Sequence, residues 1–330
     1  MGTEQIRAVV VTKNGGPEVL EVQSVPMPHF GPGQLLVEIA ASGVNFIDVY
    51  KREGVYPVPT PFVLGGECAG RVIAAGAEVS EFKPGDIVAT ASAEGTHATV
   101  AAIDADKAVP VAPGVSAELA AAAMLQGMTA HYLVNSTYQV TPGVEVLIHA
   151  AAGGVGRLLV QMAKAKGAHV IATVGSPEKE QVAGTAGADV VIRYDRIDDT
   201  DELAGVIREA SGGGVNVVYD GVGKSTFDAS LASLRPRGLL ALFGGASGQV
   251  PPVDLQRLNS GGSLFVTRPT LVHYTANREE LLWRAGEVLG AIADNTLRIA
   301  IGGRYSLEQA AEAYSDLEAR RTTGKLLIVP

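Results

Sequence analysis

Residues 144–156 read VEVLIHAAAGGVG, and this stretch decides which fold class the sequence predicts. Its first half is a continuous apolar run, which is typical of a strand buried on both faces of a parallel sheet. Its second half contains Ala151-x-Gly153-x-x-Gly156, a GxGxxG fingerprint with alanine in the first position. The pattern beyond it predicts an apolar-faced helix over 154–166 and a second strand over 169–174. Strand, glycine turn, helix and strand in this order indicate a dinucleotide-binding unit.

The residues of this unit also indicate which dinucleotide it binds. Gly153 would let the backbone approach a pyrophosphate, and Gly156 would allow the helix to pack closely on the strand. The second strand ends in Thr173-Val174-Gly175-Ser176, without the Asp or Glu that usually holds the ribose hydroxyls of NAD. The missing carboxylate removes a repulsion against a 2′-phosphate, and Lys179 would add attraction, so the sequence favours NADPH. The alternative for Lys179 is an ordinary solvated surface lysine.

Strand and helix signals alternate from about residue 117 to residue 270, which predicts a doubly wound parallel sheet. Beyond the first two strands, we expect strands at 190–192, 215–220, 239–243 and 263–267, and helices at 117–124, 179–186, 201–210 and 225–234.

Residues 1–120 read differently, as short strands separated by Gly and Pro turns, which suggests a twisted or barrel-like β domain. The end of the chain adds two predicted helices and a last strand that we expect to return to this first domain. The expected elements are strands at 6–12, 34–41, 70–75, 87–90, 97–102 and 325–329, and helices at 278–294 and 306–320.

Length, charge and cysteine content narrow the range of functions. A chain of 330 residues suggests two domains. The net charge of −9 disfavours binding to nucleic acid or to anionic membranes. The single cysteine, Cys68, excludes an internal disulfide and a cysteine-rich metal site. The first residues lack the apolar run of a signal peptide and no stretch has membrane-spanning length, so we expect a cytoplasmic protein.

The chain as a whole resembles the zinc-independent quinone oxidoreductases, the zeta-crystallin-like branch of the medium-chain dehydrogenase/reductase superfamily. The segments that carry the resemblance are GVNFID (43–48), GGECAG (65–70), QGMTA (126–130), HAAAGGVG (149–156) and VTRP (266–269). The resemblance implies a GroES-like, mainly-β catalytic domain over 1–124, completed by 271–330. It also implies an inserted Rossmann-type α/β domain over 125–270, with a doubly wound parallel sheet.

The resemblance further implies an activity and a set of site residues. It implies NADPH-dependent, metal-independent hydride transfer to quinones by a homodimer. It places Lys179, Tyr194 and Arg320 at the 2′-phosphate, and Asn45, Gln126 and Thr129 near the nicotinamide. Tyr50 matches a tyrosine of the active cleft. The remaining cofactor-binding positions are Ala152, Gly153, Gly154, Val155, Gly156, Gly175, Ser176, Phe243 and Gly244.

Zinc is not expected in this chain. Where the zinc alcohol dehydrogenases of the superfamily carry their first Cys ligand, this chain has Asn45, and their Gly-His-Glu is Gly65-Gly66-Glu67 here. Amide and glycine do not replace thiolate and imidazole as zinc ligands. The six histidines form no cluster with ligand spacing: His29, His97, His131, His149, His169 and His273.

Without a Lewis acid, the substrate must already be electron-poor, as a quinone or an enone is. Asn45 and Tyr50 are expected to hold its carbonyl side, with Tyr50 or water giving the proton. The alternative for Tyr50 is a packed phenol with a satisfied hydroxyl. We expect Asp48 and Glu67 to be structural, holding backbone N–H groups or a cation.

Two other functions stay open at this point. A zinc-independent alkenal, enone or enoyl-thioester reductase would use the same hydride chemistry on a conjugated double bond. A crystallin-like or RNA-binding protein would keep the cofactor without significant catalysis, since a fold does not fix a function.

Overall fold

The computed structural model describes residues 4–197, 199–319 and 322–330. Its contacts divide the chain into two compact units. Unit 1 combines Met1–Met128 with Thr275–Pro330, and unit 2 is Thr129–Tyr274. The prediction of an α/β unit with a parallel sheet beside a mainly-β unit is confirmed.

Unit 2 is built on a six-stranded sheet in which all neighbouring strands run parallel. The strand order is β11-β10-β9-β12-β13-β14, so the chain starts in the middle, moves to one edge and then returns to build the other half. All six carboxyl ends therefore lie along one edge of the sheet, where open α/β sheets bind their ligands. The strands are β9 (Glu145–His149), β10 (His169–Val174), β11 (Val190–Arg193), β12 (Val215–Asp220), β13 (Leu234–Leu242) and β14 (Phe265–Thr267).

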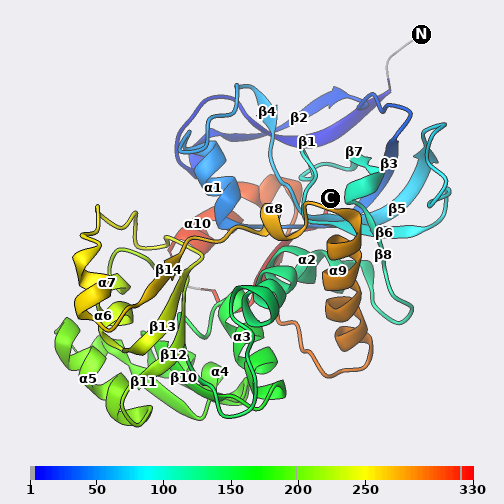
Figure 1. Ribbon diagram of the computed structural model, residues 1–330. Helices are drawn as coiled ribbons and strands as arrows, with labels where there is room; N and C mark the ends of the chain where they lie inside the picture. Colours follow the sequence, from blue (N-terminus) through cyan, green and yellow to red (C-terminus); the bar gives the residue numbers. More distant parts are fainter. Residues whose placement is uncertain (1–3, 198, 320–321) are drawn as a thin grey trace. The chain divides into compact units, whose positions relative to one another are not determined.

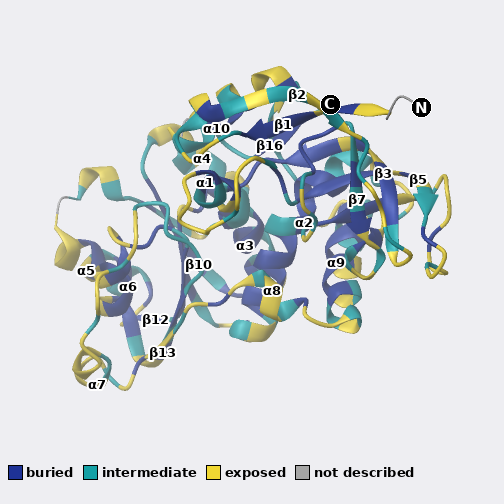
Figure 2. Ribbon diagram, turned by 90° about the horizontal axis from the view of Figure 1, so that it is seen from above, coloured by how far each residue is buried: buried dark blue, intermediate teal, exposed yellow. Residues whose placement is uncertain are grey.

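Helices cover both faces of this sheet (Figure 1). One face carries α3 (Gly154–Ala165) and α4 (Pro177–Thr185), and the other carries α5 (Thr200–Ala210) and α6 (Phe227–Ala232). Figure 2 shows the sheet strands β10 and β12 as buried and the short helix α7 (Gln256–Ser260) as exposed. The last helix of the unit is α8 (Leu271–Tyr274).

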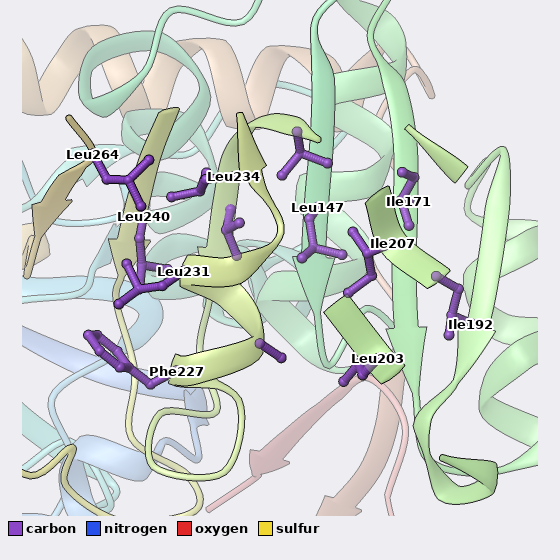
Figure 3. Close-up of a cluster of buried hydrophobic side chains, with 13 residues drawn as sticks. Leu147, Ile171, Ile192, Leu203, Ile207, Phe227, Leu231, Leu234, Leu240 and Leu264 are labelled. Carbon is purple, nitrogen blue, oxygen red and sulfur yellow. The ribbon is translucent and has the colours of Figure 1, made fainter. Parts of the chain in front are cut away.

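The core between the sheet and its second helical layer explains why this half of the chain folds as predicted. Figure 3 shows Ile207 of α5 beside Leu147 and Ile171 of the sheet, and Leu203, one helical turn earlier, belongs to the same cluster. Phe227 of α6 is buried in the same cluster. Burying each such side chain contributes about 1.5–3 kcal/mol, so the apolar strand pattern and the amphipathic helices select the same arrangement.

Unit 1 consists of two sheets with mainly antiparallel pairing. The smaller has the order β2-β1-β4, and the larger has the order β15-β16-β3-β5-β6-β8, with β7 also paired to β3. Its strands are β1 (Gln5–Val11), β2 (Leu20–Pro26), β3 (Gln34–Gly43), β4 (Phe62–Val63), β5 (Cys68–Ala75), β6 (Ile87–Thr90), β7 (Val100–Asp104), β8 (Val109–Pro110), β15 (Ile301–Tyr305) and β16 (Lys325–Ile328). Its helices are α1 (Phe46–Arg52), α9 (Arg278–Ala293) and α10 (Ala310–Glu318), while α2 (Ala117–Tyr132) begins in unit 1 and ends in unit 2.

The last strand returns to the first domain, as predicted. Leu327 and Ile328 of β16 pair with Gly43 and Ser42 of β3, directly before the segment that leads into α1. This pairing brings Lys325 from the end of the chain close to residues near position 45.

Several predicted bounds were wrong. The strand expected at 97–102 begins at Val100, because His97 accepts from the N–H of Val9 and pairs with the neighbouring sheet instead. The helix expected at 306–320 is a 3-10 turn at Leu307–Gln309 followed by α10. Among the described residues, no helix combines the length and the apolar character that crossing a bilayer requires.

Candidate active site

The glycine turn between β9 and α3 has the geometry of a phosphate-binding turn. Gly153 is the N-cap of α3 and has no side chain to cap it, so the first N–H groups of the helix remain free for an anion. A Cβ on Gly156 would lie 2.8 Å from Cα of Ala151 and closer still to the carbonyl oxygen of Ala150. Only glycine therefore lets α3 start this close to β9. The turn fits a dinucleotide pyrophosphate.

Lys179 and Tyr194, two of the residues predicted at the 2′-phosphate, each lie close to the end of β10. Ser176 caps α4 by accepting from the N–H of Lys179 at 3.3 Å, which puts Lys179 in the first turn of that helix. A Cβ on Gly175 would lie 2.7 Å from the hydroxyl of Tyr194, so the Tyr194 side chain packs directly against the glycine. The nearby carboxylate of Asp195 is bound to Arg193 at 2.6 Å. Residues 173–176 at the strand end include no acid, while the carboxylate of Glu178 in the first turn of α4 is hydrogen-bonded to the side chain of Ser176.

The last residue of β12 is an acid whose role the sequence analysis missed. Asp220 is fully buried and its Oδ1 accepts from the N–H groups of Val222 and Gly223, at 2.8 and 3.0 Å. Its Oδ2 accepts from the hydroxyls of Thr226 and Ser230 on the α6 side. Asp220 therefore fixes the loop that follows it. An acid at the carboxyl end of a predicted parallel strand, followed by glycine, was the available signal.

The same edge of the sheet holds Phe243, Gly244 and a buried histidine. The ring of Phe243 lies against Gly221, where an added Cβ would be 2.9 Å from the ring. His149 ends β9 directly before the glycine turn, and its Nδ1 is 2.7 Å from the hydroxyl of Thr173. Burial lowers the pKa of His149, so the imidazole beneath the turn is neutral at neutral pH. Its Nε2 is buried without a hydrogen-bond partner.

In unit 1, three polar side chains from distant parts of the chain form a closed cluster. The ammonium of Lys325 donates to Oε2 of Glu67 at 2.5 Å and to Oδ1 of Asn45 at 2.6 Å. Asn45 donates through Nδ2 to Glu67 at 2.8 Å and to the carbonyl of Gly43 at 3.1 Å. Oε1 of Glu67 accepts from the N–H of Leu125 at 2.6 Å. Glu67 thus holds a backbone N–H and a cation, as predicted.

A second buried network starts at the other end of the first turn of α1. Asp48 accepts from the N–H of Asn45 at 3.1 Å, which confirms its predicted structural role, and from the hydroxyl of Tyr314 at 3.0 Å. Tyr314 lies 2.7 Å from Nε2 of His97, whose Nδ1 lies 2.7 Å from the hydroxyl of Ser42. Burial raises the pKa of Asp48 to about 6, against the opposing hydrogen bond from Tyr314. Burial lowers the pKa of His97 to about 3.

The raised pKa of Asp48 predicts that a part of the stability depends on pH. The folded pKa of about 6 exceeds the ordinary value of 3.8, so the stability that protonated Asp48 contributes is present at low pH and is lost as the pH rises through about 6. Between about pH 5 and about pH 7, the unfolding free energy of the wild type should fall by about 1 kcal/mol relative to Asp48→Asn. Urea unfolding at both pH values measures this difference. The pH dependence that His97 adds to the unfolding free energy is the same in both proteins and cancels in the comparison. A difference independent of pH would contradict the raised pKa.

Tyr50 belongs to a partly exposed apolar patch on α1 and the loop after it. Its ring meets that of Tyr56 edge-on, with centroids 5.6 Å apart and planes at 73°. Tyr56 is 45% exposed, and Ile47 and Val55 are exposed as well. These exposed apolar residues lie within ten positions of one another in the chain, on α1 and the loop after it. The sequence analysis missed Tyr56, although a second tyrosine six residues after Tyr50 was the available signal.

The predicted site residues fall into two groups. Unit 1 holds Asn45, Tyr50 and Gln126, of which Asn45 caps α1, Tyr50 lies within that helix and Gln126 lies on α2. Arg320 lies outside the described residues. Unit 2 holds Thr129 on the last turns of α2 and, at the carboxyl ends of the strands, Ala152, Gly153, Gly154, Val155, Gly156, Gly175, Ser176, Lys179, Tyr194, Phe243 and Gly244.

The residues at the expected metal positions do not fit zinc. Asn45 uses both amide hydrogens and its oxygen within unit 1, and Gly66 has no side chain. The carboxylate of Glu67 is occupied by an ammonium, whose charge would repel a metal ion. In the part of the chain that the structure describes, no group of three or more His, Cys, Asp or Glu side chains is placed to hold a metal.

Comparison with known proteins assigns the chain to a family. Residues 31–145 match the alcohol dehydrogenase GroES-like domain, and residues 154–281 match the family described as zinc-binding dehydrogenase. A quinone oxidoreductase of Pseudomonas aeruginosa is 44% identical over 96% of this chain and 97% of its own. The chain belongs to the quinone oxidoreductase family of the medium-chain dehydrogenase/reductase superfamily.

This membership confirms the resemblance and the predicted GroES-like and Rossmann-type domains. Within the quinone oxidoreductase family, a mycobacterial protein solved in complex with NADPH is 49% identical and has a TM-score of 0.95, with 98% of this chain and 100% of that chain covered. A 2-haloacrylate reductase of a Burkholderia species is 38% identical over 98% of this chain and 99% of its own. Relatives of this chain thus include a protein named for the reduction of 2-haloacrylate.

Proposed function

We propose that the chain is an NADPH:quinone reductase that works without a metal ion. The observation that carries the cofactor assignment is the end of β10, where Gly175 and Ser176 replace the carboxylate of an NAD site. Lys179 and Tyr194 lie beside this strand end, where a 2′-phosphate would need a cation and a hydroxyl. The quinone assignment is supported by relatives named quinone oxidoreductase at 43–44% identity.

Bound NADPH would supply the hydride, and the residues of the chain would bind and orient both reactants. The turn at Gly153–Gly156 would hold the pyrophosphate against the first N–H groups of α3. Gln126 and Thr129 are proposed to contact the cofactor near the nicotinamide, and Arg320 to contact the 2′-phosphate. Phe243 and Gly244 are proposed as further cofactor-binding residues.

Tyr50 is the residue of unit 1 that we propose for the acceptor side. The aromatic pair of Tyr50 and Tyr56 offers apolar surface to a planar ring, and the phenol of Tyr50 would donate to a carbonyl or give the proton. Asn45, whose side chain is bound inside unit 1, would act by holding the start of α1. A Tyr50→Phe variant with an unchanged turnover at every pH would remove Tyr50 as the acid.

The second candidate function is reduction of a conjugated double bond, which the relationship to the 2-haloacrylate reductase favours. Steady-state assays with NADPH should compare benzoquinone, naphthoquinones, short enones and a haloacrylate. The proposed function predicts the highest kcat/KM for a quinone. Turnover of enones or haloacrylate alone would replace it with the second candidate, and NADPH binding without any turnover would favour the crystallin-like function.

We further propose a cytoplasmic homodimer. The edge strand β14 supports the dimer, because Phe265 and Val266 are 58% and 40% exposed on a strand that, among the described residues, pairs with β13 alone. The single, buried Cys68 supports a reducing compartment. The limits 1–124 with 271–330, and 125–270, are proposed for the catalytic and the dinucleotide-binding domain. Sedimentation of the wild type and of Phe265→Lys tests the dimer, which should weaken in the variant.

A further inference from the structure

The ion pair of Lys325 and Glu67 is unusual in being completely enclosed. The side chains are 1% and 0% exposed, and the residues are 258 positions apart in the chain. Replacing a buried ion pair by apolar side chains of similar volume is often neutral or stabilising, so stability alone does not account for such a pair. The effect of the ion pair on Asn45, which bonds to both of its members, offers a reason for the buried charges.

Lys325 stabilises one of the two possible orientations of the Asn45 side-chain amide. The ammonium donates to Oδ1 and the carboxylate of Glu67 accepts from Nδ2, so a rotation of the amide by 180° would set two donors and two acceptors against each other. The carbonyl of Gly43, which accepts from Nδ2 at 3.1 Å, favours the same orientation, and the two charges strengthen this preference. The amide orientation is thus fixed by charge, in addition to packing.

Anchoring the Asn45 side chain also anchors the residue at which α1 starts, and the contacts from this residue to the helix run through its backbone. Asn45 is the N-cap of this helix, and its own N–H donates to the carboxylate of Asp48 in the first turn. Tyr50 follows on the same seven-residue helix. In the loop after the helix, the N–H of Tyr56 donates to the carbonyl of Tyr50 at 3.0 Å. A helix this short has few internal bonds to hold it in place, so its position depends on outside contacts. These are the cap at its start, Asp48 bound to Tyr314, and Arg52 bound to Glu318 at its end.

We propose that Lys325 is a positioning residue: its buried ammonium, paired with Glu67, holds the Asn45 cap and thereby the Tyr50 side chain in the arrangement that the reaction needs. The inference rests on the proposed NADPH-dependent reduction. It assigns Lys325 no contact with substrate or cofactor.

The test compares Lys325→Met with the double variant Lys325→Met/Glu67→Gln. The single variant leaves the Glu67 carboxylate buried without a cation, and its Tm should fall by roughly 5–10 °C. The double variant removes both charges and should recover most of this Tm. If the pair were only structural, its activity would recover with the Tm. If Lys325 positions α1, the double variant should keep kcat/KM for benzoquinone about tenfold or more below the wild type, with the KM for NADPH within about twofold.

Hydrogen exchange of residues 45–52 gives a readout that needs no substrate. In the double variant these amides should exchange about tenfold faster than in the wild type, whereas Lys325→Arg, which keeps the charge, should restore slow exchange. The matched control is Arg284→Met, which removes another fully buried cation of unit 1 and should leave exchange in α1 unchanged. If the double variant does not fold, Asn45→Ala keeps the ion pair, removes only the amide, and should give the same fast exchange.

Wild-type exchange at 45–52 in the double variant or in Asn45→Ala would overturn the proposal. So would wild-type kcat/KM in a double variant whose exchange is fast. A wild-type protein that reduces none of the acceptors would refute the proposed function instead, and the exchange experiment would still decide whether Lys325 holds α1.

Discussion

A Gly156→Ala variant should bind NADPH at least about 100-fold more weakly than the wild type, because the new methyl group has no room. Its position would be 2.8 Å from Cα of Ala151 and closer to the Ala150 carbonyl oxygen, and both are backbone atoms. Either α3 would move away from β9 or the turn would deform, and each change displaces the N–H groups that would hold the pyrophosphate. Losing one or two hydrogen bonds to a charged group, at about 1.5–3 kcal/mol each, gives this magnitude. Titration of NADPH fluorescence measures it.

The matched control for this variant is Gly205→Ala. Gly205 lies inside α5, where an added Cβ meets nothing within 4 Å. This variant should keep wild-type NADPH affinity and gain about 0.5–1 kcal/mol of stability, since alanine favours a helix over glycine. Gly156→Ala with wild-type affinity would show that the turn does not bind the pyrophosphate.

A Lys179→Ala variant should lose most of its preference for NADPH. The lysine lies in the first turn of α4 beside a strand end that has no carboxylate, so its charge would act on the 2′-phosphate and on no part of NADH. We expect kcat/KM for NADPH to fall by about 10–100-fold and that for NADH to stay within about twofold. Steady-state kinetics with both cofactors and one quinone measure the two values.

Lys166→Ala is the control for the loss of a positive charge from the same unit. Lys166 follows α3 at the opposite end from the glycine turn, and its removal should change neither value. If the ratio of kcat/KM for NADPH over NADH is the same in the wild type and in Lys179→Ala, Lys179 is an ordinary solvated surface lysine, which is the alternative that the sequence also allows.

The parallel unit was predictable because its signals are local. The apolar run before Gly153, the helix after it and the bare end of β10 are each read from neighbouring residues, and they determine the sheet and the cofactor class together. The bounds of β10 and β12 agree with the predicted 169–174 and 215–220. Asp220 was missed because its role depends on Thr226 and Ser230, which the fold of the loop brings to it.

The cluster around Asn45 was only partly predictable, because its partners are far away in the sequence. Glu67 was expected to hold a cation, but nothing near it identifies Lys325, which is 258 residues further on. In the sequence Lys325 only begins an apolar strand, and the pairing of β16 with β3 is what buries it. Helix α1 was missed because seven residues are too few to show a helical period.

The central claim is that this chain delivers hydride from NADPH to quinones. The most direct measurement is the ratio of kcat/KM for NADPH over NADH in the wild type, determined with benzoquinone and with a naphthoquinone. We predict rapid quinone reduction and a ratio of about ten or more with both acceptors. A ratio near one, or no quinone reduction with either cofactor, would contradict the account.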